Sequence, residues 1–248
     1  MRHFLSSLGV HQVFRSQDKY PDTLNSGGRH VHVSLRKQLI AEFIGTAILV
    51  TVVVGSGVMG TNLTDDTAVA LLVNAVATVA GLGALIWIFG PISGAHFNPV
   101  VTLWAVIRGS ISAKGAWFYG VSQITGAIVG AILANIMFGL TAFQVSTHQR
   151  VSLGTFIGEV VATSGLLTVI ALLGKNGRSA SAHLVVPAWI GSAYFFTSST
   201  SFANPAVTIG RIFSNTFAGI APSSAMAFII AQIVGLACAL GLLRALAD

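Results

Sequence analysis

One phrase occurs twice in this sequence, as SGAHFNPVVT at Ser93–Thr102 and as SFANPAVTIG at Ser201–Gly210. Each copy joins Asn-Pro to a following Val-Thr inside strongly apolar sequence. Asparagine is a good helix N-cap, and proline fits the first helical position. The apolar segments that begin there, Asn98–Ile107 and Asn204–Phe213, have ten residues each. Ten helical residues reach about 15 Å, which is half of a hydrocarbon core of about 30 Å. The phrases therefore predict two half-helices that begin at membrane depth.

The membrane setting follows from the rest of the chain. Charged residues make up only 8% of the 248 residues, whereas a soluble domain carries about 25%. A spanning helix needs about 20 apolar residues. Six stretches of that kind are Leu39–Val58, Ala68–Phe89, Ala116–Leu140, Leu153–Leu173, Ala182–Thr200 and Ser224–Leu246. Irregular backbone in front of the half-helices is tolerated in a membrane only where protein buries it or it lines a wet cavity.

The chain is also an internal repeat. AEFIGTAILV matches GEVVATSGLL with Glu42 over Glu159, and SQITGAIVGA matches AQIVGLACAL with Gln123 over Gln232. Each half holds three spans, and an odd number of spans inserts the second half upside down relative to the first. We therefore predict an all-α membrane protein with six transmembrane helices and two re-entrant half-helices in an inverted 3+3 repeat.

Domain boundaries and orientation follow from polarity and charge. Residues 1–35 are polar and lack a long apolar run, which predicts a mobile cytoplasmic N-terminal tail. Residues 36–248 form one membrane domain, with repeats at about 36–140 and 150–248. Basic residues favour the side that carries both termini, which predicts a multi-pass protein of the inner (plasma) membrane with both termini cytoplasmic. Those residues are Arg36, Lys37, Arg108, Lys114, Lys175, Arg178 and Arg244, against Arg150 and Arg211 on the other side.

Several function classes are excluded. The formal net charge is +6, but the charges are sparse and lack a binding motif, so we expect no nucleic acid partner. The single cysteine, Cys238, rules out an internal disulfide and a cysteine-based metal cluster. The sequence shows no nucleophile–base pair, metal cluster or phosphate loop. We therefore expect no catalytic residue, metal or cofactor, and not an enzyme.

Two opposed half-helices can select a solute by its charge and its hydrogen-bonding groups. In an inverted repeat their N-termini meet near the membrane centre, and each carries about half a positive charge. At about 4 Å and an effective dielectric of about 20, two half-charges raise the free energy of a monovalent cation by roughly 4 kcal/mol. The side chains of Asn98 and Asn204 can cap their helices and still donate from nitrogen. This arrangement predicts a site for a neutral molecule with a lone pair, such as water or a small polyol.

Over residues 36–246 the chain resembles an aquaporin, a member of the major intrinsic protein family, because it has both Asn-Pro motifs, both glutamates and both Gln-x-x-Gly pairs. The resemblance implies a channel domain with a pore in each protomer of a homotetramer in the lipid bilayer. It implies that Glu42 and Glu159 are buried and hydrogen-bond the loop before a half-helix, and that His96 is a structural lining residue. The implied pore motifs are Asn98, Pro99 and Val100, and Asn204, Pro205 and Ala206.

The resemblance also places a selectivity filter. Its positions, counted without gaps from the motifs, are Thr78, Ser192, Ser201 and Val207. Most family members have arginine where this chain has Val207, and we interpret Arg211, one turn later, as an interfacial snorkelling residue. A set without arginine, aromatic residue or histidine predicts a wide, uncharged filter.

Such filters resemble those of bacterial members that pass arsenite. We therefore expect a passive channel for neutral arsenous acid and other small polyhydroxy solutes, with water. One alternative is an ordinary water or glycerol channel. Another is an ion-coupled secondary transporter, which shares inverted repeats but buries more ionisable residues than Glu42 and Glu159.

Overall fold

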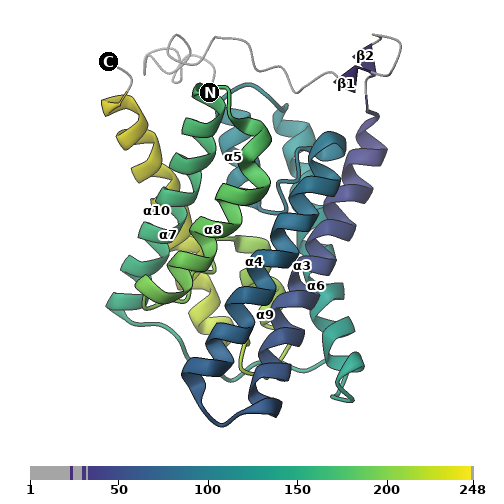
Figure 1. Cartoon of the computed structure of the whole chain (residues 1–248), viewed down its shortest axis with the longest axis vertical. Coiled ribbons are helices and arrows are strands. Elements are labelled where there is room, and N and C mark those ends of the chain that lie inside the picture. The colour runs from purple at the N-terminus through teal and green to yellow at the C-terminus, as the bar shows by residue number, and fades with distance from the viewer. Residues whose placement is uncertain (1–22, 25–29, 32, 247–248) are drawn as a thin grey trace.

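The structure is a computed structural model that describes residues 23–24, 30–31 and 33–246. Over this part of the chain the fold is a bundle of long, roughly parallel helices (Figure 1). Five of the described helices are long and apolar enough to cross a membrane. They are α3 (Leu35–Leu63), α4 (Thr67–Ser93), α6 (Ala113–Met137), α7 (Leu153–Lys175) and α10 (Pro222–Ala245). Each contains one of the predicted apolar stretches or most of it, so the all-helical membrane fold is confirmed.

The sixth predicted span is shorter than expected. Helix α8 covers Ala182–Phe196, 15 residues, and follows the 3₁₀ turn η1 at Ser179–Ser181. Together they rise about 28 Å, close to the thickness of the hydrocarbon core. The prediction of a helix as far as Thr200 was wrong because the backbone becomes extended at Thr197 and left-handed at Thr200. The last four residues of the predicted span belong to the loop that leads into the second half-helix.

Little of the predicted N-terminal tail is described. Two strands of two residues each, β1 (Thr23–Leu24) and β2 (His30–Val31), pair antiparallel. The rest of residues 1–32 lies outside the described part of the chain. The first membrane helix begins at Leu35, one residue before the predicted boundary of the membrane domain.

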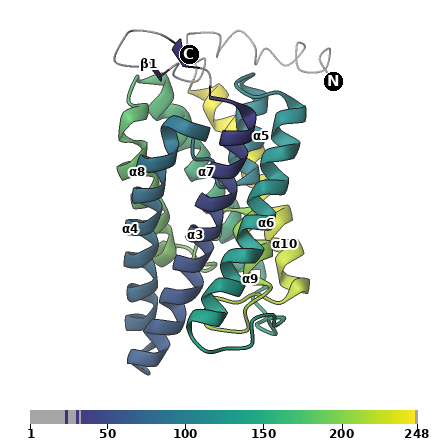
Figure 2. The ribbon, with the colours of Figure 1, turned by 90° about the vertical axis from the view of Figure 1, so that its right-hand side faces the viewer.

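The two half-helices lie in opposite halves of the bundle. Helix α5 (Pro99–Ile107) lies in the half where α3 begins and α10 ends, and α9 (Pro205–Arg211) lies in the other half (Figures 1 and 2). The order α3-α4-α5-α6 is thus repeated in inverted orientation as α7-α8-α9-α10. Asn98 and Asn204 are the N-caps, and proline follows each at the first helical position, as the sequence predicts.

Close helix crossings tie each repeat together. Helix α3 packs along α6, and α7 packs along α10. A Cβ atom at Gly126 would overlap the carbonyl oxygen of Phe43, and one at Gly130 would overlap that of Ala47. At the corresponding place in the second repeat, a Cβ at Gly235 would lie 2.9 Å from the carbonyl oxygen of Val160. These glycines let the backbones approach closely, as small residues do in membrane bundles.

We expect Gly130→Ala to destabilise the bundle by about 1–3 kcal/mol, the usual range for overpacking, because α3 must move away from α6. The matched control is Gly120→Ala on the same helix, where nothing lies within 4 Å of the added Cβ. That variant should be neutral or slightly stabilising, since alanine is the better helix former. Thermal unfolding in detergent compares the two. Equal melting temperatures would contradict the close crossing.

Candidate functional site

A cavity of about 1100 Å³ runs through the bundle. Its lining includes Asn98 and Asn204, together with Arg108 just beyond the end of α5 and Arg211 at the end of α9. The two half-helices lead away from their asparagines in opposite directions, so this lining extends into both halves of the bundle. The cavity therefore passes the half-helix junction.

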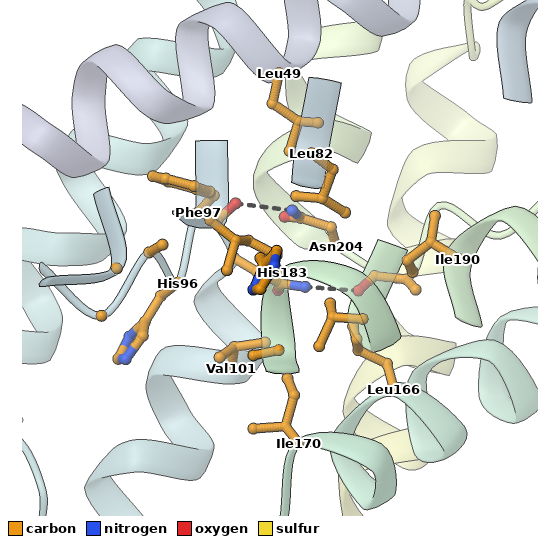
Figure 3. Close-up of a pocket in the computed structure, with 18 of the residues that line it drawn as sticks. Leu49, Leu82, His96, Phe97, Val101, Leu166, Ile170, His183, Ile190 and Asn204 are labelled. Carbon is orange, nitrogen blue, oxygen red and sulfur yellow. Dashed lines mark hydrogen bonds between the residues drawn. The ribbon is translucent and has the colours of Figure 1, made fainter. Parts of the chain in front are cut away.

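The two asparagines are held by a crossed pair of hydrogen bonds. Asn98 Nδ2 donates to the carbonyl oxygen of Ala203 at 2.8 Å, and Asn204 Nδ2 donates to that of Phe97 at 2.8 Å. Figure 3 shows the bond between Asn204 and Phe97 inside the pocket. Each amide oxygen meanwhile accepts from the backbone of its own half-helix, from Val100 N in one case and from Ala206 N in the other. Because an amide nitrogen carries two hydrogens, each asparagine keeps one N–H for a solute in the cavity.

The backbone before each half-helix is strained in the same way. Ala95 and Phe97 have φ values of 50° and 49°, and Ser201 and Ala203 have values of 51° and 46°. Residues with a Cβ atom seldom adopt this left-handed conformation, which costs about 1–2 kcal/mol each. The equivalent positions of the two repeats therefore share one unfavourable loop conformation, which other interactions must hold in place.

In the first repeat the buried carboxylate of Glu42 holds this loop. Its Oε1 accepts hydrogen bonds from Ser93 Oγ at 2.6 Å and from His96 N at 2.9 Å. Its Oε2 accepts from Phe97 N at 2.7 Å and from Gln123 Nε2 at 2.8 Å. Glu42 itself is fully buried. Four hydrogen bonds to one carboxylate offset both its desolvation and the strained backbone.

Glu159 does the same in the second repeat. Its Oε1 accepts from Phe202 N and its Oε2 from Ala203 N, both at 2.8 Å. Gln232 Nε2 donates to Oε2 at 2.6 Å. Both glutamates thus lie buried against the loop that precedes a half-helix.

A threonine in each repeated phrase completes the support, a role that we did not assign from the sequence. Gln123 Nε2 also donates to Thr102 Oγ1 at 2.9 Å, and Gln232 Nε2 to Thr208 Oγ1 at 3.0 Å. Each threonine in turn donates to the carbonyl oxygen of the asparagine four residues earlier. The recurring Val-Thr after Asn-Pro was the available sequence signal, because it places a hydroxyl one turn after each cap.

His96 lies beside the first junction. Its backbone N–H bonds Glu42, its Nδ1 lies 3.0 Å from Thr102 Oγ1, and it contributes to the cavity lining. Its ring packs against Tyr119 at a centroid distance of 5.4 Å. The remaining motif residues fill space: Val100 and Ala206 are fully buried, and Pro99 and Pro205 start their helices.

Three of the four predicted filter residues line the cavity. Thr78, Ser201 and Val207 are all buried and belong to its wall. The prediction for Ser192 was wrong, because this residue is exposed on the outside of α8, where its hydroxyl donates to the carbonyl oxygen of Ala188. The cavity face of α8 contains Val186, Ile190 and Tyr194, which recur every four residues. Ser192 falls between them on the opposite face.

Tyr194 therefore brings an aromatic side chain to the cavity wall beside Thr78, whereas the predicted filter residues included none. Its hydroxyl lies 3.3 Å from Thr78 Oγ1, so α4 and α8 meet here through a pair of hydroxyl groups. The ring is buried. This part of the wall is polar and partly aromatic.

The interpretation of Arg211 as a snorkelling residue was also wrong. Only 3% of its surface is exposed, and it lines the cavity. Its Nε donates to the carbonyl oxygen of Ala218, and its guanidinium lies 3.4 Å from the centre of the Phe202 ring. The cavity wall is therefore not uncharged.

No group of three His, Cys, Asp or Glu residues that could hold a metal ion occurs in the part of the chain that the structure describes. The cavity wall is instead largely apolar away from the junction. Figure 3 shows Leu49, Leu82 and Ile190 around the same space as Asn204. A solute therefore meets polar groups at the asparagines, near Tyr194 and Arg211 toward one end, and at His96, Arg108 and His183 toward the other.

Comparisons with known proteins agree with this geometry. The family model described as "Major intrinsic protein" matches residues 29–203. The protein named aquaglyceroporin AqpS from Rhizobium meliloti (strain 1021) is 43% identical over 85% of this chain and 90% of its own length. Aquaporin TIP2-3 from Arabidopsis thaliana is 33% identical over 68% of this chain and 69% of its own.

Solved structures show the same fold. The X-ray structure of the aquaglyceroporin from Plasmodium falciparum superposes with a TM-score of 0.60 and covers 83% of this chain and 91% of its own. Sequence identity to that chain is 22%, so this match concerns the fold alone.

Proposed function

Because the chain belongs to the major intrinsic protein family, whose members are channels and not enzymes, we propose that it is a passive transmembrane channel for small neutral solutes and water. The observation that carries the proposal is the crossed pair of hydrogen bonds between Asn98 and Ala203 and between Asn204 and Phe97. This pair of bonds holds the N-termini of both half-helices, and the side-chain amide of each asparagine, at the wall of the same cavity.

The electrostatics of the junction favour neutral solutes over ions. The N-termini of α5 and α9 both face the cavity at their caps, and each acts as about half a positive charge. A cation is repelled there by roughly 4 kcal/mol, which corresponds to about a thousandfold in occupancy. An anion would have to leave water for a wall that is mainly apolar. A hydroxyl oxygen, by contrast, accepts from both amides without a charge to desolvate.

Within this class we favour arsenous acid and other small polyhydroxy solutes, together with water. Val207 occupies the place where most family members have a larger arginine side chain, which leaves room beside Thr78 and Ser201. Arsenous acid presents three hydroxyl groups and no charge at neutral pH, much like one face of a polyol. The name of the Rhizobium meliloti relative, aquaglyceroporin, favours solutes of glycerol's kind as well.

A solute panel on purified protein in vesicles tests this function. Stopped-flow light scattering should show water, glycerol and urea crossing faster than in protein-free vesicles, and arsenic uptake should show the same for arsenous acid. Water flux alone, or water and glycerol flux without arsenous acid, would favour the ordinary water or glycerol channel. Arsenous acid flux no faster than in protein-free vesicles would contradict the arsenite proposal. Uptake that saturates and follows a proton gradient would indicate a coupled transporter.

We further propose that both termini face the cytoplasm, that residues 1–35 form a cytoplasmic tail, and that the protein is a homotetramer in the inner (plasma) membrane. The charge distribution supports this orientation. Arg150 and Arg211, on the opposite side, are bound to loop carbonyl oxygens, those of Phe217 and Gly219 for Arg150 and that of Ala218 for Arg211. These two basic residues are bound to the loops on that side. The exposed basic residues lie at the other end of the bundle, which is the end expected to face the cytoplasm.

A further inference from the structure

Arg211 is a charged residue of the cavity wall that the proposed function does not use. It ends the second half-helix, four residues after Val207, and both residues line the cavity. Residues four apart lie on the same face of a helix, and side chains tilt toward the helix N-terminus. The long side chain of Arg211 can therefore return along α9 toward the short side chain of Val207. The outer end of the pore gains a guanidinium although position 207 has none.

The guanidinium is fixed in position on one side. Its Nε donates to the carbonyl oxygen of Ala218 in the loop after α9, and its Cζ lies over the Phe202 ring, 3.4 Å from the ring centroid. Arg150 lies over the same ring at 5.6 Å and is itself bound to the carbonyl oxygens of Phe217 and Gly219. These contacts hold a charged group that would otherwise be free to rotate.

The other side of the guanidinium is available to a solute. An arginine has five N–H donors, of which Nε carries one. Within residues 33–246, neither terminal nitrogen of Arg211 forms a hydrogen bond with the protein. Both nitrogens also keep some contact with the surrounding space, because neither is among the fully buried atoms that lack a partner. The residue belongs to the cavity wall. The protein therefore takes up one of the five N–H donors, and four remain on a largely buried, positively charged side chain in the cavity wall beyond the asparagines.

We propose that Arg211 is the specificity-determining arginine of this pore, displaced by one helical turn from its usual place at position 207. There it repels cations and donates hydrogen bonds to neutral, oxygen-bearing solutes, while Val207 leaves the lumen wider than an arginine would. This inference rests on the proposed channel function. The charge of Arg211 adds to the positive potential of the half-helix junction, so both contribute to the barrier that a cation meets in the lumen.

Urea and the guanidinium ion are a suitable pair of probes, because both are planar and of similar size and only one is charged. In vesicles containing the wild-type protein, urea should enter faster than in protein-free vesicles and guanidinium should not. The neutral variants Arg211→Met and Arg211→Gln should raise guanidinium flux at least tenfold and leave urea flux within about threefold. Glutamine keeps an N–H donor for the carbonyl oxygen of Ala218, so the Arg211→Gln variant can be tested even if the Arg211→Met variant does not fold.

Two further variants separate charge from position. Arg211→Lys should keep guanidinium out, because it keeps the charge. The double variant Val207→Arg, Arg211→Val returns the guanidinium to position 207 and should restore rejection, with a narrower pore and slower urea flux. The control is Arg244→Met, which removes an exposed arginine at the end of α10 and should change neither flux.

The outcomes separate the two proposals. Neutral variants that pass urea and still reject guanidinium as well as the wild type would overturn the role of Arg211. Wild-type protein that passes guanidinium at the rate of urea would overturn it without any variant. If urea and water crossed no faster than in protein-free vesicles, the channel function itself would fail.

Discussion

Replacing Glu159 with alanine is expected to abolish water and solute flux and to lower the free energy of unfolding by about 3 kcal/mol or more. The carboxylate accepts the backbone N–H groups of Phe202 and Ala203 and the side-chain amide of Gln232. Each buried donor left without a partner costs about 1–3 kcal/mol. The left-handed backbone at Ser201 and Ala203 also loses its restraint. The loop then no longer holds the N-terminus of α9 at the cavity.

Thermal unfolding in detergent and water flux in vesicles measure both effects. Glu42→Ala should behave like Glu159→Ala, because its carboxylate bonds the corresponding groups of the first repeat. Asp65→Ala, which removes an exposed carboxylate between α3 and α4, is the control and should change neither property. A Glu159→Ala protein with wild-type stability and flux would show that the loop needs no carboxylate.

Replacing Asn204 with aspartate is expected to remove the cation barrier at the half-helix junction. The carboxylate can still accept from Ala206 N and Val207 N, so the cap of α9 is kept. It loses the donor to the carbonyl oxygen of Phe97 and places a full negative charge on the cavity. At about 4 Å and an effective dielectric of about 20, that charge attracts a monovalent cation by roughly 4 kcal/mol, which offsets the repulsion from the two helix N-termini. The exclusion of cations from the junction, about a thousandfold in occupancy, is therefore lost.

Potassium flux into vesicles, measured with a fluorescent indicator, reports this change. Glycerol flux should fall at the same time, because one amide donor is gone. Asn62→Asp makes the same chemical change on an exposed residue near the end of α3 and should leave both fluxes as they are. Unchanged potassium flux in a folded Asn204→Asp protein would mean that the junction does not decide which charges pass.

The features that the sequence predicted are those that depend on repetition. Asn-Pro at 98 and 204, Glu42 over Glu159 and Gln123 over Gln232 recur because each repeat needs the same cap, the same carboxylate and the same amide. Their hydrogen bonds join groups within one repeat, and the crossed bonds from Asn98 and Asn204 then join the two repeats. A pattern that occurs twice at matching positions therefore indicated both the half-helices and their supports.

The other side chains that line the cavity could not be predicted in the same way. Counting back from Asn204 gave Ser192, but the end of α8 and the shape of the following loop decide which side chain reaches the cavity, and that side chain is Tyr194. Arg211 was misjudged for a related reason. Its place near a membrane boundary suggested snorkelling, whereas the Phe202 ring and the Ala218 carbonyl oxygen hold it inside. Both contacts come from loops, whose conformations follow no sequence period.

The most direct test of a passive pore with an electropositive centre compares glycerol and potassium fluxes in the same vesicles. The fluxes are recorded over a range of concentrations, with and without a proton gradient. Two electropositive helix ends that meet at one open cavity should give glycerol uptake that rises in proportion to concentration and ignores the proton gradient. Potassium should enter no faster than in protein-free vesicles. Potassium flux comparable to that of glycerol, or glycerol uptake that saturates and follows protons, would contradict a passive pore with a positive centre.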